Sequence, residues 1–425
     1  MSSEIAFEMV TASIRFGEGV TREVGMDLAE GKLNQVMVLT DPNLKNLPPV
    51  TGVLESLEKH KIHYRLFDQV RVEPTDESLQ RAITFAQNDR FDALVAVGGG
   101  STIDTAKAAN LYSTYPTDFL DYVNPPVGKG LPVPGPLKPL IAIPTTSGTG
   151  SETTGVAIFD LARLKAKTGI AHRRLKPSLA LVDPLNTITQ PPRVTVSSGL
   201  DVLSHALESY TAIPYHQRPY PEKPLLRPAY QGANPISDLW SLEALRIVSK
   251  HLVRAVEDPE DRESRSQMML AASYAGIGFG NAGVHLPHGM SYPVSGLIRN
   301  YRPPGYAVDH PMVPHGISVI LNAPAVFQFT AVSCPDRHLR GAGILGADTA
   351  RARPEDAGRI LAERIIELMQ RLNVPQGLTA LGYSREDIPA LVKGTLPQHR
   401  VTKLSPRAAG EEELSRLFEA SMKIW

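Results

Sequence analysis

The feature of this chain that most constrains its fold is a series of short apolar runs in its first half. Several runs are apolar on both faces, which is the pattern of strands in a parallel sheet covered by helices on each side. Amphipathic stretches of helical period separate them. This alternation predicts a doubly wound α/β domain with a mostly parallel sheet. The expected strands span residues 35–41, 63–70, 92–100, 139–146 and 179–184.

The second half of the chain has a different pattern. Long helical periodicities, such as residues 241–256, dominate it, and few of its segments have the alternation of strands. The paired proline Pro191–Pro192 ends regular structure between the two patterns. We therefore predict an α/β domain over residues 1–192 and an all-α domain over residues 193–425.

Composition excludes several classes of protein. Lys plus Arg and Asp plus Glu both number 44, so no net charge favours nucleic acid or an anionic membrane as a partner. Cys334 is the only cysteine, which excludes an internal disulfide framework and a cysteine-based metal cluster. No apolar run approaches the roughly 20 residues that span a bilayer, and the N-terminal residues lack the pattern of a secretory signal. We expect a cytoplasmic protein.

Two runs rich in glycine and hydroxyl residues each follow an expected strand. In VAVGGGSTIDTAK (residues 95–107), three glycines let the backbone turn sharply into a helix whose first N–H groups favour an anion. IPTTSGTGSETT (residues 143–154) offers hydroxyl and backbone donors to a phosphate or ribose. Either run alone is equally well a plain turn or surface loop. At successive strand ends of one sheet, the pair favours nucleotide binding.

Asp41 lies at the end of the expected strand 35–41. A carboxylate at this position can accept hydrogen bonds from the adenosine ribose and repel a 2′-phosphate, which would favour NAD over NADP. A helix N-cap or turn aspartate is the alternative, and on sequence alone it is the commoner case.

One aspartate and several histidines in the second half suggest a metal site. Asp201 and His205 are four residues apart in a helical segment, so their side chains share a face, and both are ordinary ligands for Fe²⁺ or Zn²⁺. An exposed helical ion pair is the common alternative. Four of the chain's 12 histidines lie in one short later region: His285, His288, His310 and His315. A glycine follows His288 and His315.

Taken together, these motifs resemble the iron-containing (group III) alcohol dehydrogenase family. GGGSTIDTAK, PTTSGTGSE, GLDVLSHALESY and the PHG at residues 314–316 occur in the family's order and cover both halves of the chain. The resemblance implies an N-terminal dinucleotide-binding domain, a C-terminal helical domain, NAD, and one divalent ion, Fe²⁺ or Zn²⁺. It implies that the ion is held by Asp201, His205, His288 and His315.

The same resemblance implies which residues bind the dinucleotide. They belong to the first domain, and all except Lys167 lie in its two loops or at the end of an expected strand. The set is Asp41, Gly98, Gly99, Gly100, Ser101, Asp104, Thr145, Thr146 and Lys167.

The resemblance is closer to one branch of the family, the hydroxyacid–oxoacid transhydrogenases. VRVEPTDESL, GIGFGNAGVHLPHGMSYPVSG, DHPMVPHGISV and ALVKGTLPQHRVTKL carry it almost from end to end. It implies that 4-hydroxybutyrate and 2-oxoglutarate become succinate semialdehyde and 2-hydroxyglutarate. These carboxylates need a cation, and Arg218, Lys223 and Arg227 in the proline-rich stretch 214–235, expected as an extended loop, are candidates by charge alone.

One position departs from the family pattern. Many members carry a second histidine four residues after the third metal ligand, and this chain has Tyr292 there. A proton role of that histidine therefore does not transfer directly. We name His288, Tyr292 and His285 as candidate catalytic residues, and whether Tyr292 or His285 replaces the missing histidine stays open.

Alternative functions remain at this point. A conventional NAD-dependent dehydrogenase of simple alcohols and aldehydes has the same motifs, and a dehydroquinate synthase-like lyase has the same general architecture. A non-catalytic nucleotide-binding scaffold would bind no metal. The resemblance further implies a homo-oligomer, expected as a dimer, and places animal members in mitochondria. The mitochondrial matrix is thus the alternative location if the chain is a eukaryotic form without its leader.

Overall fold

The computed structural model describes residues 3–162 and 166–425, which form two compact units. One unit comprises residues 10–191, and the other comprises residues 192–425 together with residues 1–9. The predicted division at residue 192 had assigned the first nine residues to the α/β domain. They group with the helical unit because Glu4 forms an ion pair with Arg227 at 2.8 Å, and the Glu8 backbone N–H donates to Gln231.

The unit of residues 10–191 is built on a six-stranded parallel sheet in the order β1-β8-β5-β4-β2-β3, with a separate antiparallel pair, β6-β7. The five expected strands are confirmed. The strands are β1 (Ser13–Phe16), β2 (Gln35–Leu39), β3 (His63–Phe67), β4 (Ala93–Gly98), β5 (Leu140–Pro144), β6 (Val156–Leu161), β7 (Ala166–Ala171) and β8 (Leu179–Val182).

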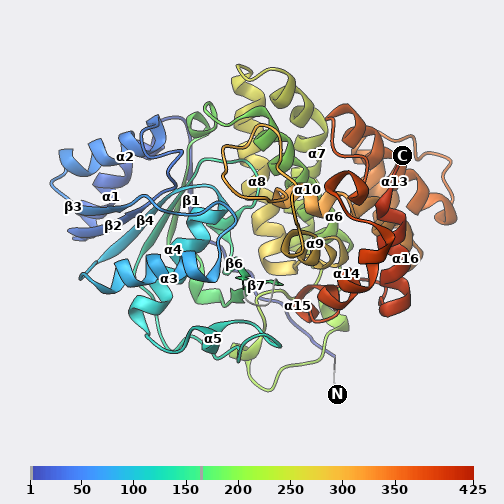
Figure 1. Cartoon of the computed structure of the whole chain (residues 1–425), viewed down its shortest axis with the longest axis horizontal. Coiled ribbons are helices and arrows are strands. Elements are labelled where there is room, and N and C mark those ends of the chain that lie inside the picture. Colours follow the sequence, from blue (N-terminus) through green and yellow to red (C-terminus); the bar gives the residue numbers. More distant parts are fainter. Residues whose placement is uncertain (1–2, 163–165) are drawn as a thin grey trace. The chain divides into compact units, whose positions relative to one another are not determined.

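Helices cover both faces of this sheet, as the apolar strands predict (Figure 1). Val36 and Val38 of β2 pack with apolar residues of α1 and α2, whereas Met37 and Leu39 of the same strand pack with α3 and α4. The strand is therefore apolar at successive positions because each face has its own core. The helices are α1 (Val24–Glu30), α2 (Pro48–Lys59), α3 (Asp76–Gln87), α4 (Gly100–Thr114) and α5 (Phe119–Tyr122).

The β6-β7 pair and the edge strand β1 were not predicted. β1 has only four residues, and its apolar side chains Ile14 and Phe16 alternate with polar ones, so it lacks the continuous apolar run of the central strands. β6 and β7 pair with each other, and β6 is anchored to α4 by the buried Lys107. The Lys107 ammonium donates to Ser151 Oγ at 2.6 Å and to the Val156 carbonyl at 2.7 Å, and it lies 3.4 Å from Asp104.

The other unit is all-α, as predicted, and its described residues form no sheet. A single large apolar core fills it, with contributions from nearly all of its helices. They are α6 (Pro192–Thr211), α7 (Pro235–Glu257), α8 (Arg262–Ala282), α9 (Leu286–Gly296), α10 (His315–Ile320), α11 (Ala323–Thr330), α12 (Pro335–Ile344), α13 (Ala357–Arg371), α14 (Ile388–Thr395), α15 (His399–Thr402) and α16 (Glu411–Met422).

The proline-rich stretch 214–235 is an extended connection, as expected, interrupted by short 3-10 turns at Tyr215–Gln217 and Pro224–Leu226. α7 begins at Pro235, with Asn234 as its N-cap. None of the described helices combines the length and the apolar character that a membrane span requires.

Replacement of Lys107 by methionine should destabilise the α/β unit. Asp104, Ser151 and the Val156 carbonyl would lose a buried cationic partner, and removing one member of a buried pair typically costs about 3–5 kcal/mol. We expect the melting temperature of this unit to fall by roughly 6–20 °C in calorimetry. The matched control is Lys45→Met, which removes a half-exposed partner of Asp68 and should shift the melting temperature by less than about 3 °C. Equal shifts for the two variants would contradict the structural role of Lys107.

Candidate metal centre

One face of α6 supplies the first two residues of a buried polar cluster. Asp201 and His205 are four residues apart, and Glu208 follows three residues later, so all three project from the same side of the helix. All three side chains are almost fully buried. Burying such polar side chains in an apolar core is costly unless they share partners or a cation. This face is therefore built for a polar function rather than for packing.

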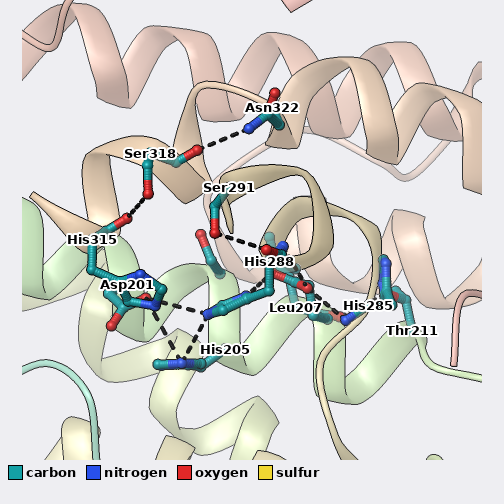
Figure 2. Close-up of polar contacts among 12 residues, drawn as sticks. Asp201, His205, Leu207, Thr211, His285, His288, Ser291, His315, Ser318 and Asn322 are labelled. Carbon is teal, nitrogen blue, oxygen red and sulfur yellow. Dashed lines mark hydrogen bonds and ion pairs between the residues drawn. The ribbon is translucent and has the colours of Figure 1, made fainter. Parts of the chain in front are cut away.

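The remaining two residues of the cluster come from α9 and α10. His288 lies in the first turn of α9, and His315 is the first residue of α10. Figure 2 shows both imidazoles beside Asp201 and His205. The four predicted ligand residues thus come together from three helices, and their ligand atoms all lie within 4.8 Å of one another.

The distances within the cluster suit a single ion. Asp201 Oδ1 lies 3.7, 3.6 and 3.8 Å from the Nε2 atoms of His205, His288 and His315, respectively. The Nε2 atoms of His205 and His288 are 3.1 Å apart. Ligands bound about 2.0–2.2 Å from a tetrahedral ion are about 3.4 Å apart, so these separations match a shared metal. In addition, Asp201 Oδ1 is buried and has no hydrogen-bond partner in the part of the chain that the structure describes.

Glu208 fixes the orientation of the His288 imidazole from the side away from Asp201. Its Oε1 lies 2.6 Å from Nδ1 of His288, and its Oε2 accepts from the backbone N–H of His285 at 2.7 Å. A carboxylate bonded to Nδ1 leaves Nε2 as the metal-facing nitrogen and makes the imidazole a stronger ligand. Glu208 was not among the site residues predicted from the sequence. Its position seven residues after Asp201, on the face that carries both metal ligands, was a signal that could have found it.

Close packing explains the glycine that follows each of two histidine ligands. A Cβ on Gly316 would lie 1.9 Å from the Ser197 carbonyl of α6, and a Cβ on Gly289 would lie 2.8 Å from Thr402 of α15. Glycine therefore allows α10 to approach α6, and α15 to approach α9. The glycine of each His-Gly dipeptide therefore lets α10 and α9, which carry His315 and His288, pack closely against their neighbours.

Electrostatics prepare the cluster for a cation. Burial lowers the pKa of His205 to about 3, although Asp201 opposes the change, so this imidazole is neutral at pH 7. Burial alone would raise the pKa of Asp201, but His205 and His315 outweigh it and hold that pKa below its usual range. For His288, burial would lower the pKa, but Glu208 and Asp201 raise it to about 10. His288 is therefore protonated at pH 7 before a metal binds.

The other two candidate catalytic residues lie in different surroundings. His285 is fully buried, and its Nε2 lies 3.0 Å from Thr211 Oγ1 (Figure 2). Its ring is edge-on to that of Phe327. Tyr292 lies one helical turn after His288 on α9, and its hydroxyl accepts from Arg400 at 2.7 Å. Neither is a member of the four-residue cluster. Their catalytic roles stay predictions.

The two predicted nucleotide loops follow neighbouring strands in the α/β unit. β4 and β5 pair up to Gly98 and Pro144, and Thr145 donates its N–H to the Gly98 carbonyl at 3.1 Å. A Cβ on Gly99 would lie 3.1 Å from Thr146 Oγ1, so the two loops touch. The strand order also reverses between β4 and β2, and Asp41 follows β2. Ligands of doubly wound folds bind at such a reversal.

Three predicted cofactor residues are engaged with the protein itself. Asp104 accepts from Ser151 at 2.5 Å and from the Ile158 N–H at 2.9 Å. Lys167 is buried and forms ion pairs with Glu73 at 2.6 Å and with Asp160 at 3.4 Å. Ser101 Oγ accepts from the backbone N–H of Glu73 at 3.1 Å. These contacts brace the loops and the β6-β7 pair.

Comparisons with known proteins agree with this geometry. The family model described as "Iron-containing alcohol dehydrogenase" matches residues 11–184, and the model described as "Fe-containing alcohol dehydrogenase family, C-terminal" matches residues 229–422. The hydroxyacid-oxoacid transhydrogenase, mitochondrial, of Xenopus laevis is 63% identical over all of this chain and 92% of that protein. Its Homo sapiens counterpart is 61% identical over all of this chain and 91% of that protein.

Solved structures show the same fold. A 1,3-propanediol oxidoreductase superposes with a TM-score of 0.85 at 25% identity, covering 98% of this chain and 100% of its own. The iron-containing alcohol dehydrogenase of Thermococcus thioreducens gives a TM-score of 0.81 at 27% identity, covering 98% and 99%. A sulfoacetaldehyde reductase from Bifidobacterium kashiwanohense, in complex with NAD⁺, gives 0.79 at 24% identity, with the same coverage.

Replacement of Glu208 by glutamine should weaken metal binding although all four ligands remain. Loss of a carboxylate partner behind a histidine ligand typically costs about 10–100-fold in metal affinity, and competition with a chelator measures it. His288→Ala should abolish stoichiometric metal binding, and Glu243→Gln, an exposed change on α7, should leave affinity unchanged. Full metal affinity in Glu208→Gln would contradict the role given to this carboxylate.

Metal binding at pH 7 should release about one proton, because the ion must displace it from His288 while His205 is already neutral and Asp201 ionised. Affinity should accordingly rise with pH from about 7 toward the His288 pKa of about 10. Titration calorimetry in two buffers of different ionisation enthalpy measures the protons released. A pH-independent affinity with no proton release would show that His288 is already unprotonated in the metal-free protein.

Proposed function

The chain belongs to the iron-containing alcohol dehydrogenase family, and we propose that it is a hydroxyacid–oxoacid transhydrogenase. The protein is an oxidoreductase that acts on CH–OH groups, and its family uses NAD and a divalent metal ion. The proposed reaction converts 4-hydroxybutyrate and 2-oxoglutarate into succinate semialdehyde and 2-hydroxyglutarate. Two hydrogens leave the hydroxyl-bearing carbon and its oxygen in the first acid, and two are added to the keto group of the second.

The single observation that carries the proposal is the buried cluster of Asp201, His205, His288 and His315. Its spacing and its unpartnered carboxylate oxygen fit one divalent ion, and an Asp-His₃ donor set suits Fe²⁺ and Zn²⁺ alike. When bound, such an ion is a Lewis acid that makes a substrate hydroxyl more acidic and polarises a carbonyl. The protein's own contribution is to keep the donors fixed: Glu208 orients His288, and Phe279 stacks on His205 with ring centroids 3.9 Å apart.

For NAD we propose a site at the carboxyl ends of β2, β4 and β5. Asp41 follows the first strand, Gly98–Ser101 follow the second, and Thr145 and Thr146 follow the third. Their support is the reversal of strand order at this place and the close approach of the two loops. Asp104 and Lys167 take part through the contacts that brace these loops. The nicotinamide, when bound, accepts and returns the hydride.

The choice of substrates rests on the curated relatives. Two proteins named hydroxyacid-oxoacid transhydrogenase match the whole chain at more than 60% identity. A conventional NAD-dependent alcohol dehydrogenase is the second candidate, favoured by the descriptions of the solved neighbours. None of these relatives supports the third alternative, a dehydroquinate synthase-like lyase.

Location and assembly are also proposals. The relatives are named mitochondrial proteins, which supports the mitochondrial matrix over the cytoplasm expected from the sequence. For the expected homodimer, the exposed Ile236 and Leu239 at the start of α7 are apolar side chains that a partner could cover. Light scattering on the purified protein measures its oligomeric state.

The transhydrogenase reaction should proceed without added NAD, because one NAD that stays bound to the protein would accept the hydride from the first acid and return it to the second. Purified, metal-loaded enzyme mixed with 4-hydroxybutyrate and 2-oxoglutarate should form 2-hydroxyglutarate and succinate semialdehyde in equal amounts, because each hydride removed from one acid is given to the other. Chromatography of both products measures this ratio, and His288→Ala is the inactive control.

Two outcomes would favour the other candidates. Brisk alcohol oxidation with free NAD⁺ but no 2-hydroxyglutarate would support the conventional dehydrogenase. Purified protein that neither contains nor takes up metal would support a non-catalytic scaffold.

A further inference from the structure

The short helix α15 packs directly beside the metal-ligand helix α9. A Cβ on Gly289, the residue after His288, would lie 2.8 Å from Thr402 and 3.4 Å from Val401. Arg400 belongs to the same short helix, one residue before Val401. The chain therefore places a permanent cation on an element that contacts α9 next to a metal ligand.

The Arg400 guanidinium has aromatic and phenolic neighbours. Nη2 donates to the Tyr292 hydroxyl at 2.7 Å, and Cζ lies 5.0 Å from the centroid of the Tyr230 ring. Nη1 is buried and has no hydrogen-bond partner among the residues that the structure describes. Within those same residues, no carboxylate lies within 4.0 Å of this guanidinium.

Two other partly buried arginines of this unit are neutralised by acids, whereas Arg218 donates to the Tyr230 carbonyl at 2.8 Å. Arg227 binds Glu4 through two nitrogens, at 2.8 and 3.0 Å, and Arg337 binds Asp238 at 2.5 Å. A buried cation without an anion is costly, and a guanidinium is the side chain best shaped to hold a carboxylate in two parallel hydrogen bonds. Arg227, a cation suggested by the sequence, is already committed to Glu4, whereas Arg400 is available.

Two separate series of contacts lead from the metal ligands to Arg400. Along α9, His288 and Tyr292 lie one turn apart on the same face, about 6 Å from each other, and Tyr292 touches the guanidinium. On the other side, His205 stacks on Phe279 at 3.9 Å between ring centroids. The Phe279 ring is 6.3 Å from that of Tyr230, which in turn lies under Arg400. One side chain, Tyr292, thus separates the guanidinium from the cluster on the first route, and two, Phe279 and Tyr230, separate them on the second.

We propose that Arg400, positioned by Tyr292 and Tyr230, binds the carboxylate of the hydroxyacid and of the oxoacid and so selects acids over uncharged alcohols. This inference rests on the proposed function and names the residue that would give it its substrate class. Tyr292 then has a role other than that of the histidine it replaces: its hydroxyl orients the guanidinium.

The chemistry of the two substrates is consistent with one shared anchor. In 4-hydroxybutyrate, three carbon–carbon bonds separate the hydroxyl-bearing carbon from the carboxylate carbon. In 2-oxoglutarate, three carbon–carbon bonds separate the keto carbon from the distal carboxylate carbon. This distance is roughly 4 Å along an extended chain. A single cation at a fixed distance from the reacting carbon can therefore serve both directions of hydride transfer.

The test compares Arg400→Met with two other variants in metal-loaded enzyme. Arg400→Lys keeps the charge without the two parallel donors, and Arg407→Met removes an exposed arginine that also lies over an aromatic ring, Phe329. We measure the ratio of kcat/KM for 4-hydroxybutyrate to kcat/KM for butane-1,4-diol, which has the same carbon chain without the charge. The ratio should fall about 10–100-fold in Arg400→Met, fall less in Arg400→Lys, and stay unchanged in Arg407→Met.

A second readout does not depend on turnover. Glutarate has the two carboxylates of 2-oxoglutarate but no keto group, and calorimetry on the same metal-loaded proteins measures its binding. Arg400→Met should bind glutarate at least about tenfold more weakly than the wild type. Circular dichroism and metal content of each variant show whether it is folded and loaded.

Several outcomes would overturn the inference. They are a substrate ratio that stays constant in Arg400→Met, glutarate binding that does not change, or a wild-type protein that does not bind glutarate at all. A purely structural role for Arg400 would lower both activities together and leave their ratio constant. Failure of the proposed function is separate: a wild type that forms no 2-hydroxyglutarate refutes the transhydrogenase, while glutarate binding still decides the role of Arg400.

Discussion

The helical unit depends on the attraction between one buried carboxylate and the positive charge that must neutralise it. Asp201 lies among three imidazoles, and its Oδ1 has no hydrogen-bond partner in the described chain. Such a group is tolerated in a dry interior only when a cation completes it. The requirement extends outward: Glu208 orients His288, and glycines let the ligand helices approach one another closely. The core of the unit is thus arranged to keep four donor atoms within one coordination sphere.

In the α/β unit, too, buried charged side chains hold functional segments in place. Its loops consist of small residues because they touch: a side chain on Gly99 or Gly100 would meet Thr146 or Thr149. Buried lysines, rather than apolar contacts, fix the segments next to these two loops. Lys107 joins α4 to the start of β6, and Lys167 joins β7 to Glu73. Both lysines are almost completely removed from solvent, so their stabilising value depends on partners that stay in place.

Arg400 and Tyr292 show how a family site can change its specificity with little change in fold. The four residues of the cluster lie on α6, α9 and α10, and the phenol of Tyr292, one turn after His288, accepts a hydrogen bond from a guanidinium of the adjacent α15. A cation near a Lewis-acidic centre favours anionic substrates by charge, and its aromatic neighbours fix its direction. The proposed substrate class then depends on a residue that lies 112 positions after His288 in the chain, so no local motif joins the two residues.

The sequence by itself determined the fold class and the five central strands, because each leaves a local signature, and its family resemblance predicted the four residues of the buried cluster. Apolar runs buried on both faces mark a parallel sheet, and Asp201 and His205 are one helical turn apart. Only the tertiary structure decided which segments pack against these strands and helices. β1 and the β6-β7 pair are stabilised by distant partners, the first nine residues join the helical unit through Glu4 and Arg227, and Glu208 and Arg400 acquire their partners only when separate helices meet. Hydrogen bonds and ion pairs between remote segments leave no periodicity in a sequence, so only the folded chain reveals them.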